Sequence, residues 1–138
     1  LIAQEEGIEL HFFEEEAVTE HPNTLRLVLK SQKETMEITG ISTGGGAIQI
    51  TELNGFALRL SGENPAILIL HKDAYGTVAA VTAVLTEYEI NISHMEVSRL
   101  EKGCTALMAI ETDQPTGKAV LQRLSEEKNV QKIITLNV

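Results

Sequence analysis

A short polar loop contains the residues best suited to bind a small charged molecule. Residues 71–76 read His-Lys-Asp-Ala-Tyr-Gly, and Asn91 follows fifteen residues later. His71 could donate a hydrogen bond to a carboxylate, Asp73 could accept one from an ammonium group, and Asn91 could do either. Gly76 would let a ligand approach the backbone, and free N–H groups at a helix start attract anions. These groups can hold a free amino acid by both ends, and the candidate ligand-binding residues are His71, Asp73, Tyr75, Gly76 and Asn91.

The same loop also has a purely structural interpretation. Asp73 could cap the helix that follows, and Gly76 could relieve backbone strain in an ordinary turn. Both interpretations place the loop between a strand and a helix.

The flanking sequence predicts that strand and that helix. Residues 66–70 form an unbroken apolar run, which is typical of a strand in the middle of a sheet covered by helices. From Gly76 onward, apolar residues recur at helical spacing, which predicts an amphipathic helix of about three turns. Its buried stripe is expected to contain Val78, Val81, Val84, Leu85 and Tyr88, with Thr77, Thr82, Thr86 and Glu87 facing water.

The remaining sequence completes a strand-helix-strand-strand-helix-strand order. Apolar and polar residues alternate over 92–99, and residues 104–110 are mostly apolar, so both segments are predicted strands. The glycine-containing turn between them predicts a hairpin. A second helix should begin at an N-cap on Thr116, bury Val120, Leu121 and Leu124, and stop near Asn129, ahead of a last strand over 130–138. Because both crossovers must be right-handed, both helices should cover one face of a four-stranded sheet. This is the ferredoxin-like βαββαβ arrangement.

The first part of the chain is predicted to be mainly β. Five strands are expected, at residues 8–13, 24–30, 34–43, 47–53 and 56–60. Asn54-Gly55 is the strongest turn signal, because both residues tolerate the positive φ of a two-residue hairpin turn. Residues 61–65 contain Gly and Pro and form the natural boundary between a segment at 1–65 and a domain at 66–138. Five short strands suggest a fragment of a larger domain, one face of which a further N-terminal portion would cover.

Other reactive residue types give no catalytic pattern. Gly44-Gly45-Gly46 lacks the Lys and Ser/Thr of a phosphate-binding loop, so a bulge or sharp bend is favoured. His11, His21 and His94 show no metal-ligand spacing. The single cysteine, Cys104, cannot form an intrachain disulfide or hold a metal cluster alone, and we expect it to be a small buried side chain. No catalytic residue and no metal ligand are predicted.

Composition excludes two classes of partner. The chain has 138 residues and a formal net charge of −9, so it should repel nucleic acid. No apolar stretch is long enough for a membrane span and no secretion signal is evident, so we expect no membrane contact and a cytoplasmic location.

Residues 71–76 with Asn91-Ile92 resemble the ACT domain of amino-acid metabolism, over all of residues 66–138. The chain would then be of the α+β class, with a ferredoxin-like βαββαβ ACT domain preceded by a small mainly-β segment. In related D-3-phosphoglycerate dehydrogenases, serine is bound at a pattern His-x-Asn-x-x-Gly followed by Asn-Ile. The matching positions are His71, Asp73, Gly76 and Asn91, with Asp73 standing where that pattern has asparagine.

Four further segments extend the resemblance over both halves. Residues 21–24, 39–46, 50–56 and 94–97, in that order, look like the β chain of bacterial iron–sulfur L-serine dehydratases. The resemblance implies that residues 1–65 are the C-terminal part of an allosteric substrate-binding domain.

The division of labour in that family implies a regulatory component of an L-serine ammonia-lyase. L-serine or a related amino acid would bind at the ACT loop and be sensed there. A catalytic α chain, associated with a 4Fe-4S cluster, would convert L-serine to pyruvate and ammonia. This chain would carry no cofactor and would pair with a second copy through its ACT domain, the effector lying between the loop of one copy and the helix of the other. The alternative is a structural docking or dimerisation module with no ligand of its own.

Overall fold

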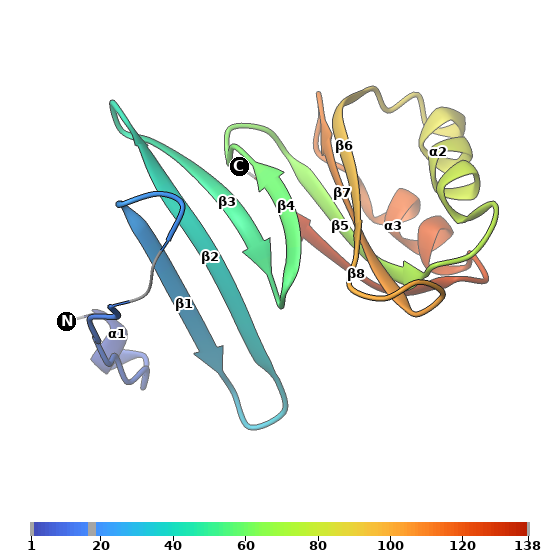
Figure 1. Cartoon of the computed structure of the whole chain (residues 1–138). Helices are drawn as coiled ribbons and strands as arrows, with labels where there is room; N and C mark the ends of the chain where they lie inside the picture. Colours follow the sequence, from blue (N-terminus) through green and yellow to red (C-terminus); the bar gives the residue numbers. More distant parts are fainter. Residues whose placement is uncertain (1, 17–18, 138) are drawn as a thin grey trace.

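The computed structural model describes residues 2–16 and 19–137 and divides them into two four-stranded sheets. A short helix α1 (Ile2–Glu5) precedes the first sheet (Figure 1), which is antiparallel with its strands in chain order. Its strands are β1 (Thr24–Lys30), β2 (Thr35–Gly44), β3 (Ala47–Leu53) and β4 (Phe56–Leu60). Four of the five strands expected in this part are therefore present.

The turns of the first sheet follow the glycine and asparagine positions. Asn54 and Gly55 have φ of 49° and 84° between β3 and β4, as the hairpin prediction requires. Gly44, Gly45 and Gly46 all have positive φ, and the pairing of β2 with β3 shifts register between Ser42 and Gly44. The triple glycine is thus the bulged turn favoured from sequence.

The second part of the chain folds as predicted, in the order strand, helix, strand, strand, helix, strand. Its elements are β5 (Ala66–Lys72), α2 (Thr77–Glu87), β6 (Ile92–Arg99), β7 (Thr105–Thr112), α3 (Lys118–Ser125) and β8 (Val130–Leu136). The strand order is β6-β7-β5-β8 with every pair antiparallel, which is the ferredoxin-like topology. As expected, β5 lies in the middle of the sheet.

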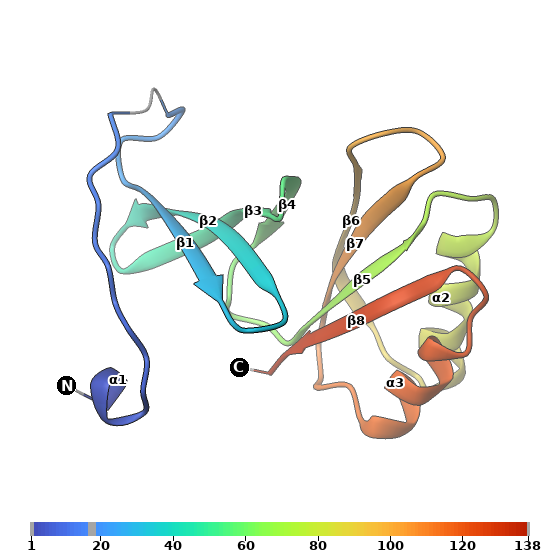
Figure 2. The same cartoon turned by 90° about the horizontal axis from the view of Figure 1, so that it is seen from below.

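The second sheet is buried on both faces, because side chains alternate between two clusters. On one face, Ile67, Ile69, Met108 and Ile110 pack against apolar residues of α2 and α3. On the other face, β5 and β7 contribute residues to a cluster completed by β3 and β4, which contains Leu53, Phe56, Leu58, Leu60, Ala66, Leu68, Leu107 and Ala109. Figure 2 shows the resulting layers, with the second sheet between the helices and the first sheet.

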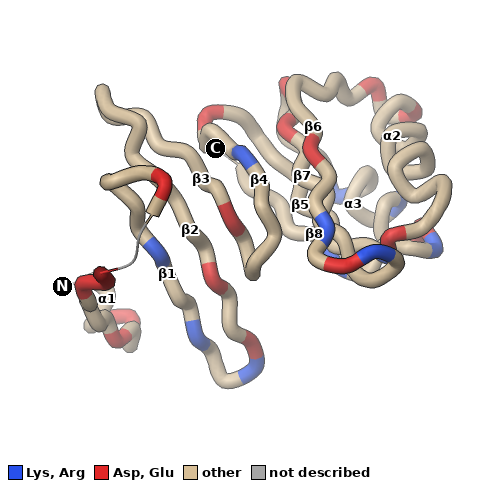
Figure 3. Tube along the Cα trace, in the orientation of Figure 1, with Lys and Arg blue, Asp and Glu red and all other residues tan. Residues whose placement is uncertain are grey.

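The strand predicted at residues 8–13 is wrong. The segment is irregular, and Phe12 and Phe13 are 89% and 85% exposed. In the part of the chain that the structure describes, these residues pair with no strand, so their alternating pattern has no sheet to join. Residues 1–16 also contain six glutamates and no Lys or Arg, so much of the acidic excess lies outside the two sheets (Figure 3).

Two details of the predicted helices are also wrong. Thr77 is buried rather than facing water, because its hydroxyl donates to the carbonyl of Ala74 (3.1 Å) and accepts from the Asn129 amide (3.0 Å). Helix α3 begins after Gly117 without a side-chain cap, and Thr116 is buried instead of capping. Neither change alters the topology.

Two side chains of the predicted buried stripe of α2 are open to solvent, and so are three leucines of β1. On α2, Val78 and Tyr88 are 37% and 40% exposed, and along β1 Leu25, Leu27 and Leu29 are exposed as well. No helix in the described part of the chain has both the length and the hydropathy needed to cross a bilayer.

Candidate functional site

His71 lies at the end of β5 on the helix-covered face of the sheet and is 2% exposed. Its Nδ1 is 2.9 Å from the Lys72 carbonyl oxygen. Because a carbonyl only accepts, Nδ1 carries the proton, and in the neutral ring Nε2 is left as an acceptor. This Nε2 is buried and has no hydrogen-bond partner among the described residues. The imidazole is therefore set up to accept from an ammonium or hydroxyl group, rather than to donate to a carboxylate as the sequence suggested.

Asp73 follows directly after β5 and is already engaged within the chain. Its Oδ2 accepts from the Gly103 backbone N–H and from Nη1 of Arg99, both at 2.9 Å. The Gly103 hydrogen bond, and after it the one from Arg99, hold the pKa of the Asp73 carboxyl below its ordinary value. Asp73 thus fastens the loop to the turn between β6 and β7, and does not cap α2.

The two residues directly before α2, Tyr75 and Gly76, face solvent. Gly76 precedes the helix with φ of 79°, and a Cβ placed there would meet no atom within 4 Å. The backbone conformation, and not crowding, therefore favours glycine at this position. The Tyr75 side chain is fully exposed beside it. The loop thus offers an open approach to the first turn of an eleven-residue helix.

Asn91 lies at the opposite end of the sheet from His71. Ile92 pairs with Thr112 at one end of β7, whereas His71 pairs with Ala106 at the other. Six residues of strand separate these ends, which is about 20 Å. The Asn91 amide donates to Asp113 (2.6 Å), which leaves its carbonyl oxygen as an acceptor. Within one copy, His71 and Asn91 cannot hold the same small molecule.

Asp73 and Asn91 each form hydrogen bonds with residues that the sequence analysis did not single out. Arg99 and Gly103 hold Asp73, and Asp113 holds Asn91. The strand order β6-β7-β5 could have indicated the contacts of Asp73, because it places the β6–β7 turn beside the end of β5.

The described residues do not fit a metal or cluster site. They include no group of three or more His, Cys, Asp or Glu side chains that could hold a metal ion. Cys104 alone cannot supply the ligands of an iron–sulfur cluster. The expectation that Cys104 is buried is wrong, because it precedes β7 in the turn and is exposed.

Comparison with known proteins agrees with this architecture. Residues 66–129 match the ACT domain family. The chain is 50% identical over 129 residues to the probable L-serine dehydratase β chain of Bacillus subtilis, which covers 94% of this chain and 59% of that one. It is 30% identical over 96 residues to the L-serine dehydratase β chain of Peptoniphilus asaccharolyticus, and the matched segment covers 69% of this chain and 43% of that one. The D-3-phosphoglycerate dehydrogenase of Methanocaldococcus jannaschii is 27% identical over 116 residues, which is 84% of this chain and 22% of the enzyme.

The C-terminal half of the chain is therefore an ACT domain, as its topology and loop predicted. The chain as a whole is a relative of L-serine dehydratase β chains, and it spans less than two thirds of the length of the Bacillus and Peptoniphilus β chains.

Proposed function

We propose that this chain is a regulatory portion of an L-serine dehydratase, which binds L-serine or a related small amino acid and acts with a catalytic α chain. The observation that carries the proposal is the buried Nε2 of His71, which has no hydrogen-bond partner in the part of the chain that the structure describes. It lies at the loop of an ACT domain in a chain related to serine dehydratase β chains. In this proposal residues 1–65 are part of an allosteric substrate-binding domain.

We propose further that the binding site is completed by a second copy. Strand β6 lies at the edge of its sheet, where β7 is its one partner among the described strands, and it exposes the apolar side chains of Met95 and Val97. A two-fold axis beside β6 would run the two edges antiparallel and bring the Asn91 end of one copy to the His71 end of the other.

The charges of a zwitterion fit the two sides of such a site. The ammonium group would donate to Nε2 of His71 and to the carbonyl oxygen of Asn91 from the second copy. The carboxylate would lie at the first turn of α2, where Gly76 leaves the backbone accessible. Asp73 would stay paired with Arg99 and would not repel the carboxylate.

Calorimetric titration of the purified chain with L-serine, combined with sedimentation, tests this proposal. We expect saturable binding of L-serine, little binding of D-serine, and a dimer in solution. A chain that binds no amino acid at millimolar concentration would contradict it.

A second candidate function is a docking module without a ligand. The exposed apolar row Leu25, Leu27 and Leu29 on β1 favours contact with another polypeptide. This function predicts that amino acids leave the melting temperature unchanged while the chain still binds the α chain of a serine dehydratase in sedimentation.

A further inference from the structure

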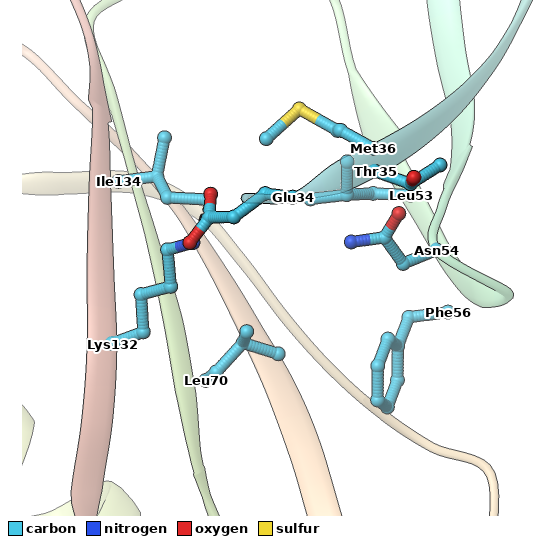
Figure 4. A pocket seen from close by; sticks show the side chains of 9 residues that line it. All are labelled: Glu34, Thr35, Met36, Leu53, Asn54, Phe56, Leu70, Lys132 and Ile134. Atoms are coloured by element: carbon cyan, nitrogen blue, oxygen red, sulfur yellow. Dashed lines mark hydrogen bonds and ion pairs between the residues drawn. The ribbon is translucent and has the colours of Figure 1, made fainter. Parts of the chain in front are cut away.

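A pocket of about 260 Å³ lies between the two sheets, on the face of β5 opposite to His71 (Figure 4). The β1–β2 turn and the start of β2, the end of β3 and the β3–β4 turn form one side, and β5 and β8 form the other. The residues that line it are Glu34, Thr35, Met36, Leu53, Asn54, Phe56, Leu70, Lys132 and Ile134.

One opposite-charge pair spans the pocket. Nζ of Lys132 on β8 is 3.1 Å from both carboxylate oxygens of Glu34, in the β1–β2 turn. The two side chains are 44% and 66% exposed, and an ion pair this open to water contributes little to stability. A ligand that offers its own charges can therefore separate the pair at low cost.

Much of the remaining wall is apolar, and the Asn54 amide is directed inward. Met36, Phe56, Leu70 and Ile134 surround the space beside the ion pair, and Figure 4 shows the amide nitrogen of Asn54 pointing into it. The Asn54 side-chain oxygen is occupied, because it accepts from the Glu37 backbone N–H at 2.8 Å. The Asn54 nitrogen is thus held in place as a donor that points into the pocket.

We propose that this pocket binds a free α-amino acid with an apolar side chain. The ligand carboxylate pairs with Lys132 and the Asn54 amide, the ligand ammonium pairs with Glu34, and the side chain packs on Met36 and Ile134. A zwitterion replaces both members of the ion pair without leaving either charge unpaired, which a simple anion or cation cannot do. A phosphate or nucleotide is disfavoured because Glu34 would repel it.

This site is separate from the one at the ACT loop. Leu70 and His71 are neighbours on β5, and their side chains point to opposite faces of the sheet. The loop site, with its polar acceptors, suits serine, whereas the apolar wall between the sheets favours a ligand such as L-leucine. Binding here would join the two sheets through the ligand.

Methyl NMR of the full chain, titrated with L-leucine, tests the proposal. We expect L-leucine to shift the methyl signals of Met36 and Ile134 in a saturable way up to about 10 mM, enough to fill most of a site with millimolar Kd. L-serine, 4-methylpentanoate and 3-methylbutylamine each lack one of the three features and should shift these signals at least tenfold more weakly. No shift with L-leucine, or an equal response to 4-methylpentanoate, would overturn the proposal.

Variants of the ion pair provide the matched comparison. Lys132→Gln should weaken L-leucine binding at least tenfold, whereas Lys128→Gln, an exposed change of the same charge outside the pocket, should leave it unaltered. Both variants should keep the wild-type melting temperature without ligand. Equal L-leucine affinity in the Lys132→Gln chain would contradict the assigned role of Lys132.

Discussion

The imidazole of His71 has a buried acceptor atom, Nε2, to which no group in residues 2–16 or 19–137 donates a hydrogen bond. A buried acceptor without a hydrogen bond lowers the stability of the folded chain by roughly 1–3 kcal/mol, and a bound donor would restore this free energy. Its orientation is fixed by the Nδ1 hydrogen bond to Lys72, so the lone pair of Nε2 cannot turn away. A ligand donor is the natural complement of this arrangement.

Replacing His71 by leucine should abolish most L-serine binding. The apolar side chain suits a buried position, but it removes a hydrogen bond to a charged group, which predicts a roughly 10- to 150-fold loss of affinity. Calorimetry measures this loss, with His11→Ala in the exposed N-terminal segment as the control. Unchanged affinity in the His71→Leu chain would refute the assignment of Nε2 as the acceptor.

Asp73 should contribute to stability in a pH-dependent way. Because its folded-state pKa lies below the ordinary value of 3.8, its contribution is present above that pH and is lost as the pH falls through the lowered pKa. Asp73→Asn should therefore lose less thermal stability than the wild type between about pH 5 and pH 3.

Thermal unfolding followed by circular dichroism at both pH values measures this difference. Glu101→Gln, in the same β6–β7 turn, is the control for removing a carboxylate. An identical acid dependence in the Asp73→Asn and wild-type chains would show that the contacts from Gly103 and Arg99 do not matter to stability.

At the scale of elements, one partly buried hydrogen bond links the start of α2 to the segment before β8. Thr77 accepts from Asn129 and also donates to Ala74, so its hydroxyl joins two segments of the helical layer. The loop that contains His71 lies between β5 and this anchored helix start. The link helps to hold the loop in one conformation.

Thr77→Val should reduce the free energy of unfolding by about 1–2 kcal/mol. Valine has nearly the same shape, but it leaves the Asn129 amide without its acceptor and removes one of the two donors to the Ala74 carbonyl, which keeps the Thr77 backbone N–H. Thr86→Val, an exposed change on the same helix with the same propensity cost, should stay within about 0.5 kcal/mol of wild type. Urea denaturation compares the two, and equal values would contradict the role of Thr77.

At the scale of the whole molecule, the two sheets share a hydrophobic cluster. Leu58 on β4 is 2% exposed and belongs to the same cluster as Leu68, Leu107 and Ala109 of the ACT sheet. The face of the ACT sheet away from its helices is thereby covered by β4. We expect the two sheets to unfold as one unit.

Leu58→Ala should destabilise both sheets together by about 2–5 kcal/mol, the range for truncating a buried leucine. Hydrogen exchange of the β5 and β7 amides should accelerate along with that of β4. Leu25→Ala on the exposed face of β1 is the control, with little expected effect. Unaltered protection of β5 and β7 in the Leu58→Ala chain would show that the sheets are energetically independent.

The sequence was sufficient for the topology, because hydrophobic period and right-handed crossovers allow few arrangements of residues 66–138. It was insufficient where a residue's environment depends on distant contacts. Thr77 looks like a surface threonine until Asn129 is placed beside it, and residues 8–13 have a strand pattern but no partner. The chemistry of Asn91 and the resemblance to a serine-binding pattern predict one site with His71, whereas the intervening helix carries Asn91 to the other end of the sheet.

The central claim, a ligand site shared between two copies, is tested most directly by mixing two variants. Chains with His71→Leu or Asn91→Ala should each fail to bind L-serine in calorimetry. In a mixed dimer one of the two sites regains both residues, so an equimolar mixture refolded together should recover roughly a quarter of the wild-type stoichiometry. A mixture that binds no more than its components would contradict the shared site.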